Sequence, residues 1–367
     1  PSPGSRYRVA AVSRKDNGLP DTSNISPVAT NFGYFGGGET PSAKLTIVDR
    51  IDYSNDTATA VAKGPLSVAR RFISATGNSS FGYFGGGGNP AVAQYSVVDR
   101  LDYSSDTTAA APKGPLGQQK WSHGATGNSS FGYFGGGLNH LGSVTSSIFR
   151  IDYSNDTATA AAKGPLGATR KELAATGNSF FGYFGGGSSN KSTVDRIDYS
   201  NDTATAAAKG PLSVGKTGSA GTGNSSFGYF GGGAPGPYST VDRVDYSNDT
   251  ATAAAKGPLS SARYYLAATS ASENALPTDT GILTLFNPAS SVRENVAPQG
   301  TDFGYFTVGP TQNSTTINRI DYSNDTAAAV AKGPLSVAKY AADGTGNASF
   351  GYFGGGYGNN PVGGISI

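Results

Sequence analysis

The sequence contains no cysteine, which excludes a disulfide, a thiolate nucleophile and a cysteine-based metal site. Charged residues are also scarce, because they make up only 14% of 367 residues and leave a net charge of +2. That balance argues against electrostatic capture of nucleic acid or of an anionic membrane. No run of about 18 apolar residues occurs, so we expect no membrane-spanning helix. The composition favours a chain stabilised by packing, with no cofactor, no nucleic-acid partner and no membrane insertion.

Methionine is absent too, and the chain begins at Pro1 without a signal-peptide pattern. We interpret the chain as a processed or excerpted piece of a longer product.

A strict repeat of aromatic and glycine residues is what the sequence does contain. The motif FGYFGGG, with its variant FGYFTVG, begins at Phe32, Phe81, Phe131, Phe181, Phe227, Phe303 and Phe350. Successive copies lie 49, 50, 50, 46, 76 and 47 residues apart, and a turn motif close to DYSND keeps the same rhythm. A period near 50 residues, with several short strands in each unit, is typical of a β-propeller blade.

We therefore predict an all-β fold, a seven-bladed β-propeller of four-stranded antiparallel blades that forms a single domain over residues 1–367. Each blade takes about 47–50 residues, and an insertion at Ser270–Thr301 enlarges blade six. There are seven aromatic-glycine motifs but only six turn motifs. We expect the N-terminal segment Arg6–Arg14 to close the ring by joining the C-terminal blade, because closure removes an open sheet edge.

The aromatic-glycine motif is interpreted as the second strand of each blade. In the second blade we expect four strands, named a to d, near residues 70–76, 80–86, 95–103 and 107–113. Phe84 should face one neighbouring blade while Phe81 and Tyr83 face the other, since side chains alternate along a strand. Gly85 and Gly86 should let neighbouring sheets approach closely and adopt turn conformations forbidden to other residues.

An arginine recurs in each third strand with a neighbouring aspartate: Arg50, Arg100, Arg150, Arg196, Arg243 and Arg319. We predict a partly buried ring of arginine–carboxylate contacts between blades, because the planar guanidinium suits two-pronged carboxylate binding. A functional anion site is the alternative.

Three motifs suggest chemistry but fit the repeat better. The segment Gly210–Thr217 matches a phosphate-binding loop, yet that loop needs a following helix, and we place this segment between two strands. His123 and His140, the only histidines, are expected on different parts of one blade, so we predict no metal or catalytic site. The DYSND motif lacks the spacing of a calcium loop and is predicted to be a turn.

The pattern resembles the kelch repeat. The shared features are a glycine pair (Gly85–Gly86), an aspartate at the end of the next strand (Asp102), and the linker KGPLSVAR ending at Arg70. The chain differs at the positions where that family has tyrosine and tryptophan, occupied here by Leu101 and Thr108. The near-verbatim repeats also look like those of marine bacteriophage virion proteins. These likenesses imply a propeller that serves protein binding or host attachment.

The loops between strands b and c vary while the blades stay nearly constant, and a rigid scaffold with variable loops is a common way to build a binding surface. Binding candidates in these loops are Tyr95, Asn139, His140, Tyr238 and Tyr357. We interpret the chain as a non-enzymatic interaction or structural module, in a virion fibre or other extracellular assembly rather than the cytoplasm. Its partners would be protein subunits or a cell-surface glycan, and the Ser270–Thr301 insertion is predicted to be a docking surface. The alternatives are a glycan-binding lectin-like propeller, a kelch-type protein–protein adaptor and an enzyme.

Overall fold

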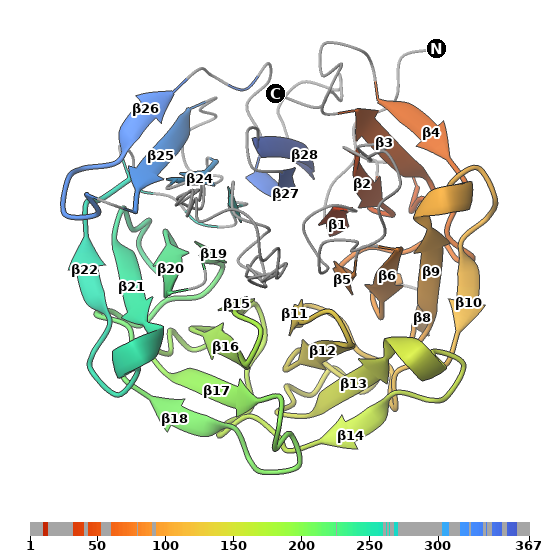
Figure 1. The fold of residues 1–367 in the computed structure, drawn as a ribbon, viewed down its shortest axis with the longest axis horizontal. Helices are drawn as coiled ribbons and strands as arrows, with labels where there is room; N and C mark the ends of the chain where they lie inside the picture. The colour runs from red at the N-terminus through yellow and green to blue at the C-terminus, as the bar shows by residue number, and fades with distance from the viewer. Residues whose placement is uncertain are drawn as a thin grey trace, which may run out of the picture.

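The structure is a computed structural model that describes residues 10–13, 32–39, 43–52, 60–78, 80–89, 93–224, 226–259, 262, 264, 268–270, 303–307, 316–322, 324–332, 335, 340–346 and 351–357. Within these residues the fold is all-β, and six antiparallel four-stranded sheets surround a central axis as blades (Figure 1). This is a β-propeller, as the repeat predicts.

The blades follow one another along the chain. Blade one contains β1 (Ala10–Ser13), β2 (Phe32–Gly36), β3 (Val48–Asp52) and β4 (Val61–Lys63). Blade two contains β5 (Ser74–Gly77), β6 (Phe81–Gly85), β9 (Val98–Asp102) and β10 (Ala111–Lys113), with the small hairpin β7 (Gly88–Asn89) and β8 (Ala93–Gln94) between β6 and β9. Blade three contains β11 (Gly124–Gly127), β12 (Phe131–Gly135), β13 (Ile148–Asp152) and β14 (Ala161–Lys163).

The remaining blades repeat this order. Blade four contains β15 (Ala174–Gly177), β16 (Phe181–Gly185), β17 (Val194–Asp198) and β18 (Ala207–Lys209). Blade five contains β19 (Ala220–Gly223), β20 (Phe227–Gly231), β21 (Val241–Asp245) and β22 (Ala254–Lys256). Blade six contains β23 (Ala268–Ser270), β24 (Phe303–Phe306), β25 (Ile317–Asp321) and β26 (Val330–Lys332). The first strand of each blade, strand a, lies nearest the axis, as β5, β11, β15 and β19 show in Figure 1.

The predicted seven-bladed ring is wrong, because the structure has six four-stranded blades. The seventh aromatic-glycine motif instead forms a two-stranded sheet of β27 (Tyr340–Gly346) and β28 (Gly351–Tyr357), which lies between blade six and blade one (Figure 1).

The predicted closure by the N-terminal strand is wrong as well. β1 pairs with β2, with Ala10 opposite Gly36 and Ser13 opposite Gly33, so it is strand a of blade one. The physical reason is that β1 precedes β2 in the chain, as strand a precedes strand b in the other blades, and so supplies the inner neighbour of β2. Without β1 the inner edge of β2 would stay unpaired. The expected C-terminal partner, Gly363–Ile367, lies outside the described residues.

The hydrophobic core is divided among the junctions between blades. At the junction of blades two and three, for example, Tyr83 and Val98 pack with Phe134 and Ile151. Phe84 is fully buried and contacts blade one at Gly36, where an added Cβ would lie 2.8 Å from its ring. A Cβ added at Gly85 would likewise lie 2.7 Å from the ring of Phe134. The aromatic of each blade thus fills space that a glycine of the preceding blade leaves open.

The DYSND motif forms the turn between strands c and d, as predicted. In three blades it contains a short 3₁₀ helix: η1 (Tyr103–Ser105), η2 (Tyr153–Asn155) and η3 (Tyr246–Asn248). The first aspartate caps the turn, since the Asp102 side chain accepts a 2.8 Å hydrogen bond from the Ser104 amide.

Candidate functional site

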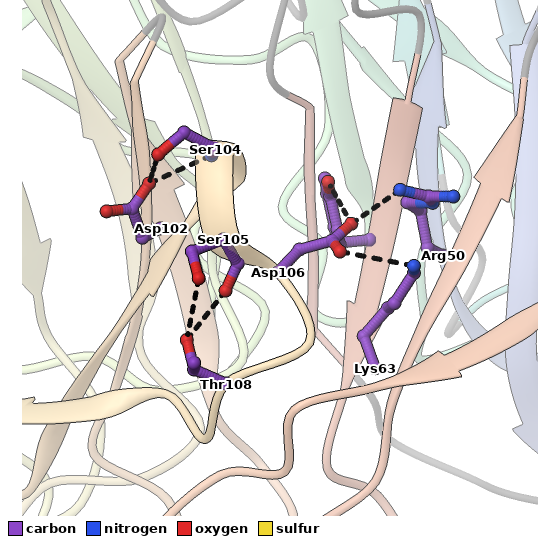
Figure 2. A network of polar contacts seen from close by, with 8 residues as sticks. Arg50, Lys63, Asp102, Ser104, Ser105, Asp106 and Thr108 are labelled. Carbon is purple, nitrogen blue, oxygen red and sulfur yellow. Dashed lines mark hydrogen bonds and ion pairs between the residues drawn. The ribbon is translucent and has the colours of Figure 1, made fainter.

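The second aspartate of each turn motif connects two blades through what we call the inter-blade clamp. Figure 2 shows one copy, in which Arg50 and Lys63 of blade one converge on Asp106 of blade two, at 2.7 and 3.1 Å. The Tyr34 hydroxyl, also from blade one, donates to the same carboxylate at 2.9 Å. Although burial opposes it, hydrogen bonds from Tyr34 and Lys63 and the charge of Arg50 hold the pKa of Asp106 below its usual value.

Within the described residues, this clamp is present at five junctions. Arginines of strand c bind aspartates of the following blade in the pairs Arg50–Asp106, Arg100–Asp156, Arg150–Asp202, Arg196–Asp249 and Arg243–Asp325. The partner is therefore the turn aspartate of the next blade rather than the aspartate beside the arginine in its own strand. The sixth arginine, Arg319, lies 4.0 Å above the centre of the Phe303 ring. The five ion pairs account for their arginines through folding, because each pair joins neighbouring blades.

The aspartate beside the arginine has a different partner, a cation buried inside the same blade. Arg70 pairs with Asp99 at 2.8 Å, and neither side chain is exposed to solvent. The pairs Arg170–Asp195 and Lys216–Asp242 are equally buried in blades four and five, at 2.5 and 2.8 Å. Lys216 is the lysine of the phosphate-loop match, and β19, a strand rather than a helix, follows it. A buried, ion-paired lysine cannot bind phosphate, so that motif is structural.

Blade six has Asn318 and blade three has Phe149 at the position of the buried aspartate, and blade three shows what the cation does without a carboxylate. Its cation, Lys120, is fully buried, but the Nζ atom donates only to neutral groups: the carbonyl oxygens of Gly136 and Ser147 and the hydroxyls of Thr145 and Ser147. Burial without a carboxylate lowers the pKa of Lys120 to about 7.

His123 lies in the same blade, next to the ring of Phe134, with ring centres 5.7 Å apart. Burial, assisted by the charge of Lys120, lowers its pKa to about 3, so the ring is neutral at physiological pH. His140 is exposed in the loop before β13. Within the part of the chain that the structure describes, no three metal-ligating side chains gather at one point.

Two variable segments meet on one face of the ring. The first is the b–c loop, and the second is the end of the connection that leads from strand d to strand a of the next blade. Backbone bridges join them in the pairs Arg71–Gly88, Trp121–Leu138 and Thr217–Ala234, and the Ser188 amide donates to the Lys171 carbonyl. We call this surface the loop face. Sequence inspection identified the b–c loops but missed the second segment, although RRFIS, KWSHG, RKELA and KTGSA differ at nearly every position.

Part of the loop face has an uncommon backbone conformation. Phe72, Ser122 and Glu172 have φ of +57°, +52° and +54°, where blade five has Gly218 at +61°. A bulky residue with positive φ is a genuine outlier. Hydrogen bonds run along these residues from blade to blade, from Ser122 to Phe72 at 3.3 Å and from Glu172 to Ser122 at 3.0 Å. This backbone chain holds their side chains in fixed places on the face.

An array of charged and aromatic side chains crosses the loop face from blade one to blade three. Glu39 is buried and pairs with Lys44 at 2.8 Å and with Arg71. The Arg71 guanidinium lies 4.7 Å above the centre of the Phe72 ring, and the Phe72 ring lies 5.2 Å from that of Trp121. Both aromatic rings are partly exposed. We call Arg71, Phe72 and Trp121 the aromatic–arginine array.

Four of the residues predicted for binding, Tyr95, Asn139, His140 and Tyr238, lie in these b–c loops but differ in accessibility. Tyr95 and Tyr238 are only partly exposed. The Asn139 side chain accepts hydrogen bonds from the amides of Leu141 and Ser143, both at 3.0 Å, and so shapes its own loop. Tyr357 ends β28, opposite Tyr340. Apart from Ser270, the predicted docking insertion Ser270–Thr301 lies outside the described residues.

Comparisons with known proteins address the fold. No family model matches the chain, and no curated protein matches it. A solved structure titled "Structure of YjhT" is similar, with a TM-score of 0.55 and 12% sequence identity over 100% of this chain and 94% of that one. At this identity the likeness concerns the fold alone and supports the β-propeller. The likenesses to kelch repeats and to bacteriophage proteins stay predictions. No helix among the described residues is long and apolar enough to cross a membrane.

Proposed function

We propose that this protein is a non-enzymatic binding module, part of a virion fibre or other extracellular assembly, that attaches to its target through the loop face. The observation that carries the proposal is the aromatic–arginine array. Tryptophan and arginine are enriched among residues that dominate binding energy at interfaces, and here both stand partly exposed beside a second aromatic ring. The blades below them are nearly constant in sequence, so variation is concentrated where a partner would bind.

The backbone supports the same interpretation. Non-glycine residues with positive φ persist only where surrounding structure imposes the conformation, and they cluster at binding and active sites. Blade five shows that glycine is compatible with this position, yet blade two carries Phe72 there at φ +57°. An aromatic ring placed at an energetic cost is consistent with selection for recognition rather than for stability.

A non-enzymatic role agrees with the state of the recurring carboxylates. Each of the five clamp aspartates contacts two cations from the preceding blade, and Asp99, Asp195 and Asp242 are buried against one cation each. General acid–base chemistry needs a carboxylate within reach of a substrate. These carboxylates are committed to packing, so they support binding as the function of the repeat rather than catalysis.

A glycan partner is a second candidate, favoured by the same two rings. Partly exposed Phe72 and Trp121, with Arg71 beside them, offer apolar faces for a sugar and a cation for an acidic group. A protein partner would use the array as an anchor that enters a pocket. Glycan-array binding by the purified chain distinguishes the two, because a protein-binding module should give no specific signal.

The two aromatic rings of the array can be removed without disturbing the fold by substituting the residues that blade five has at the same positions. In a double variant, Phe72→Gly and Trp121→Thr, each position receives what Gly218 or Thr217 carries there. We expect normal folding, since Phe72→Gly relieves a strained φ, and at least a tenfold loss of attachment. Attachment would be measured by flow cytometry of the labelled chain on a panel of marine bacteria and on a glycan array.

The matched control is Glu172→Gly, which makes the same backbone change in blade four but removes no aromatic ring. It should attach like the wild type. Attachment of the double variant at wild-type strength, with an unchanged melting temperature, would refute the loop face as the binding surface.

A further inference from the structure

The aromatic–arginine array is anchored in blade three by a short segment that contains two buried titratable side chains. Trp121 of the array lies between Lys120 and His123 in residues 120–123, which lead into β11. The exposed fraction is 0% for Lys120 and 6% for His123. Protonation of either side chain would therefore place a buried charge next to a residue of the array.

Lys120 has no carboxylate that could compensate a positive charge. Among the described residues, its Nζ atom donates only to carbonyl and hydroxyl oxygens. The centre of the Phe149 ring lies 5.6 Å from Nζ, where Lys216, the counterpart in blade five, has Asp242 at 2.8 Å. A buried ammonium without a counter-ion is disfavoured, so blade three accommodates the neutral amine better.

His123 has still fewer partners. Among the described residues, neither ring nitrogen has a partner at hydrogen-bond distance. The ring packs against that of Phe134, with ring centres 5.7 Å apart, at the position that Leu173 occupies in blade four. The site is therefore shaped for an apolar side chain and accepts the neutral imidazole but not the charged one.

Within the described part of the chain, the neighbouring elements supply no charge that balances either group. Their titratable and charged side chains are His140 in the b–c loop of blade three; Tyr95, Arg71 and the pair Arg70–Asp99 in blade two; and Glu172 and the pair Arg170–Asp195 in blade four. Opposite charges balance within each pair, His140 is exposed, and Arg71 pairs with Glu39. The Glu172 carboxylate contacts Lys171 and Thr217.

These surroundings disfavour the charged form of both groups. Burial lowers the pKa of Lys120 from an ordinary 10.5 to about 7. Burial, and then the charge of Lys120, lower the pKa of His123 from 6.5 to about 3, although the Gly85 carbonyl favours the charged ring. A movement that exposes both groups to water is thus favoured by acid, because the exposed groups take up protons that the buried groups exclude. From pH 8 to pH 5 it becomes about tenfold more favourable through Lys120 and about thirtyfold through His123.

Trp121 is held by its backbone and by packing. Its backbone bridges Leu138 with hydrogen bonds of 3.1 and 2.8 Å, and its ring packs against Phe72. The indole N–H is inaccessible and has no acceptor among the described residues. A movement of residues 120–123 that brings the two titratable groups to water would therefore carry the ring away from Phe72, with no side-chain hydrogen bond to retain it.

We propose that Lys120 and His123 make the aromatic–arginine array sensitive to acid, so that the loop face binds its target at alkaline pH and releases it on acidification. The release rests on the proposed function, whereas the acid sensitivity of the array does not. Blades two, four and five have no such pair, because each has a carboxylate beside the buried cation and none has a histidine at the position of His123.

The experiment uses the fluorescence of Trp121, which is the only tryptophan in the chain. Acrylamide quenching measures the accessibility of this ring and needs no target. In the wild type the quenching constant should rise from pH 8 to pH 5, while far-UV circular dichroism stays unchanged because the blades remain folded. Attachment to the bacteria and to the glycan array should be at least tenfold weaker at pH 5 than at pH 8.

The matched control gives blade three the residues of other blades. His123→Leu introduces the leucine of blade four, and Phe149→Asp gives Lys120 the carboxylate of blade two. In this double variant neither quenching nor attachment should change with pH. His123→Leu alone should remove the larger part of the quenching change, which keeps the test decisive if Phe149→Asp does not fold.

The two readouts separate the acid sensitivity of the array from the proposed function. An unchanged quenching constant in the wild type, or an equal change in the double variant, would overturn the acid sensitivity. If quenching changes as expected but attachment is the same at both pH values, the array does not govern binding, and the release is refuted together with the proposed function.

Discussion

Blades two and three both bury a cation where the connection between blades enters strand a, but they neutralise it differently. In blade two Arg70 meets the Asp99 carboxylate at 2.8 Å, with both side chains inaccessible to solvent. In blade three Phe149 occupies the carboxylate position. Lys120 donates instead to the Thr145 hydroxyl and to the carbonyl and hydroxyl oxygens of Ser147. Those two hydroxyls come from the b–c loop, where blade two has Tyr95 and Val97.

The comparison shows that a buried basic side chain is kept at this position even where its carboxylate partner is absent. In the four blades where the structure describes this basic side chain, it donates to carbonyl oxygens: Arg70 to that of Phe84, Lys120 to that of Ser147, Arg170 to that of Gly186 and Lys216 to that of Phe230. A buried carbonyl without a donor costs about 1–3 kcal/mol. The donor hydrogen bonds are therefore the shared requirement, and the carboxylate neutralises the charge where it is present.

The largest expected effect comes from removing the cation of blade two. Arg70→Met leaves Asp99 buried without a counter-ion, and breaking a buried pair costs about 3–5 kcal/mol. Lys120→Met in blade three leaves only neutral acceptors, so it should cost about 1–2 kcal/mol. Urea denaturation of both variants measures the difference. Equal losses would show that the two blades do not differ in the way described.

The pH dependence of stability separates the same two blades. The pKa of Lys120 is about 7 in the folded chain against an ordinary 10.5. Between these values the unfolded chain holds a proton that the folded chain has released, so the contribution of Lys120 to stability rises with pH. The slope reaches about 1.4 kcal/mol per pH unit. Relative to Lys120→Met, the wild type should gain stability from pH 7 to pH 9. If the free energies of unfolding of the two proteins changed equally over this range, Lys120 would not be a buried lysine without a carboxylate partner.

A carboxylate placed in blade three should abolish that slope. Phe149→Asp recreates the arrangement of blades two, four and five, and a buried carboxylate raises the pKa of Lys120 toward its ordinary value. The free energy of unfolding should then change by less than about 0.5 kcal/mol between pH 7 and pH 9, relative to Lys120→Met. A slope that persists in Phe149→Asp would mean that Lys120 is not the titrating group.

The smallest effect concerns a feature that both blades share. Asp102 and Asp152 cap equivalent turns by accepting from the amides of Ser104 and Ser154 at 2.8 and 2.9 Å. Asp102→Ala and Asp152→Ala should each cost about 1 kcal/mol, the typical value for a lost cap. Melting curves of the two variants should therefore coincide, and a clear difference would show that the turns are not equivalent.

The repeat predicted the parts of this molecule that depend on local sequence. Alternation in FGYFG placed Phe84 on a blade-facing side, and the glycines predicted the close approach that Phe84 and Phe134 make to Gly36 and Gly85. The turn role of DYSND follows from its short polar side chains. The strand-c arginines were predicted to contact carboxylates, but the partner could not be identified because it lies 56 residues away in the pair Arg50–Asp106.

The loop face illustrates the same limit for the candidate site. The b–c loops could be recognised from their variation, but nothing local shows that Arg71 bridges to Gly88 or that Phe72 lies beside Trp121. Phe72 and Trp121 are 49 residues apart and come into contact only because two blades pack side by side.

The sequence by itself determined the blade, its strand order and its turn chemistry, because these follow from alternation, glycine geometry and hydrogen bonding over a few residues. Only the tertiary structure decided how many blades form and with which strand Ala10–Ser13 pairs. The segment at Ala10–Ser13 could satisfy either an outer or an inner sheet edge by its alternation alone. It pairs with the inner edge of β2, which would otherwise have unpaired backbone groups. The choice between the inner and the outer edge therefore depends on which backbone groups the rest of the ring leaves unpaired, rather than on a local preference of the segment.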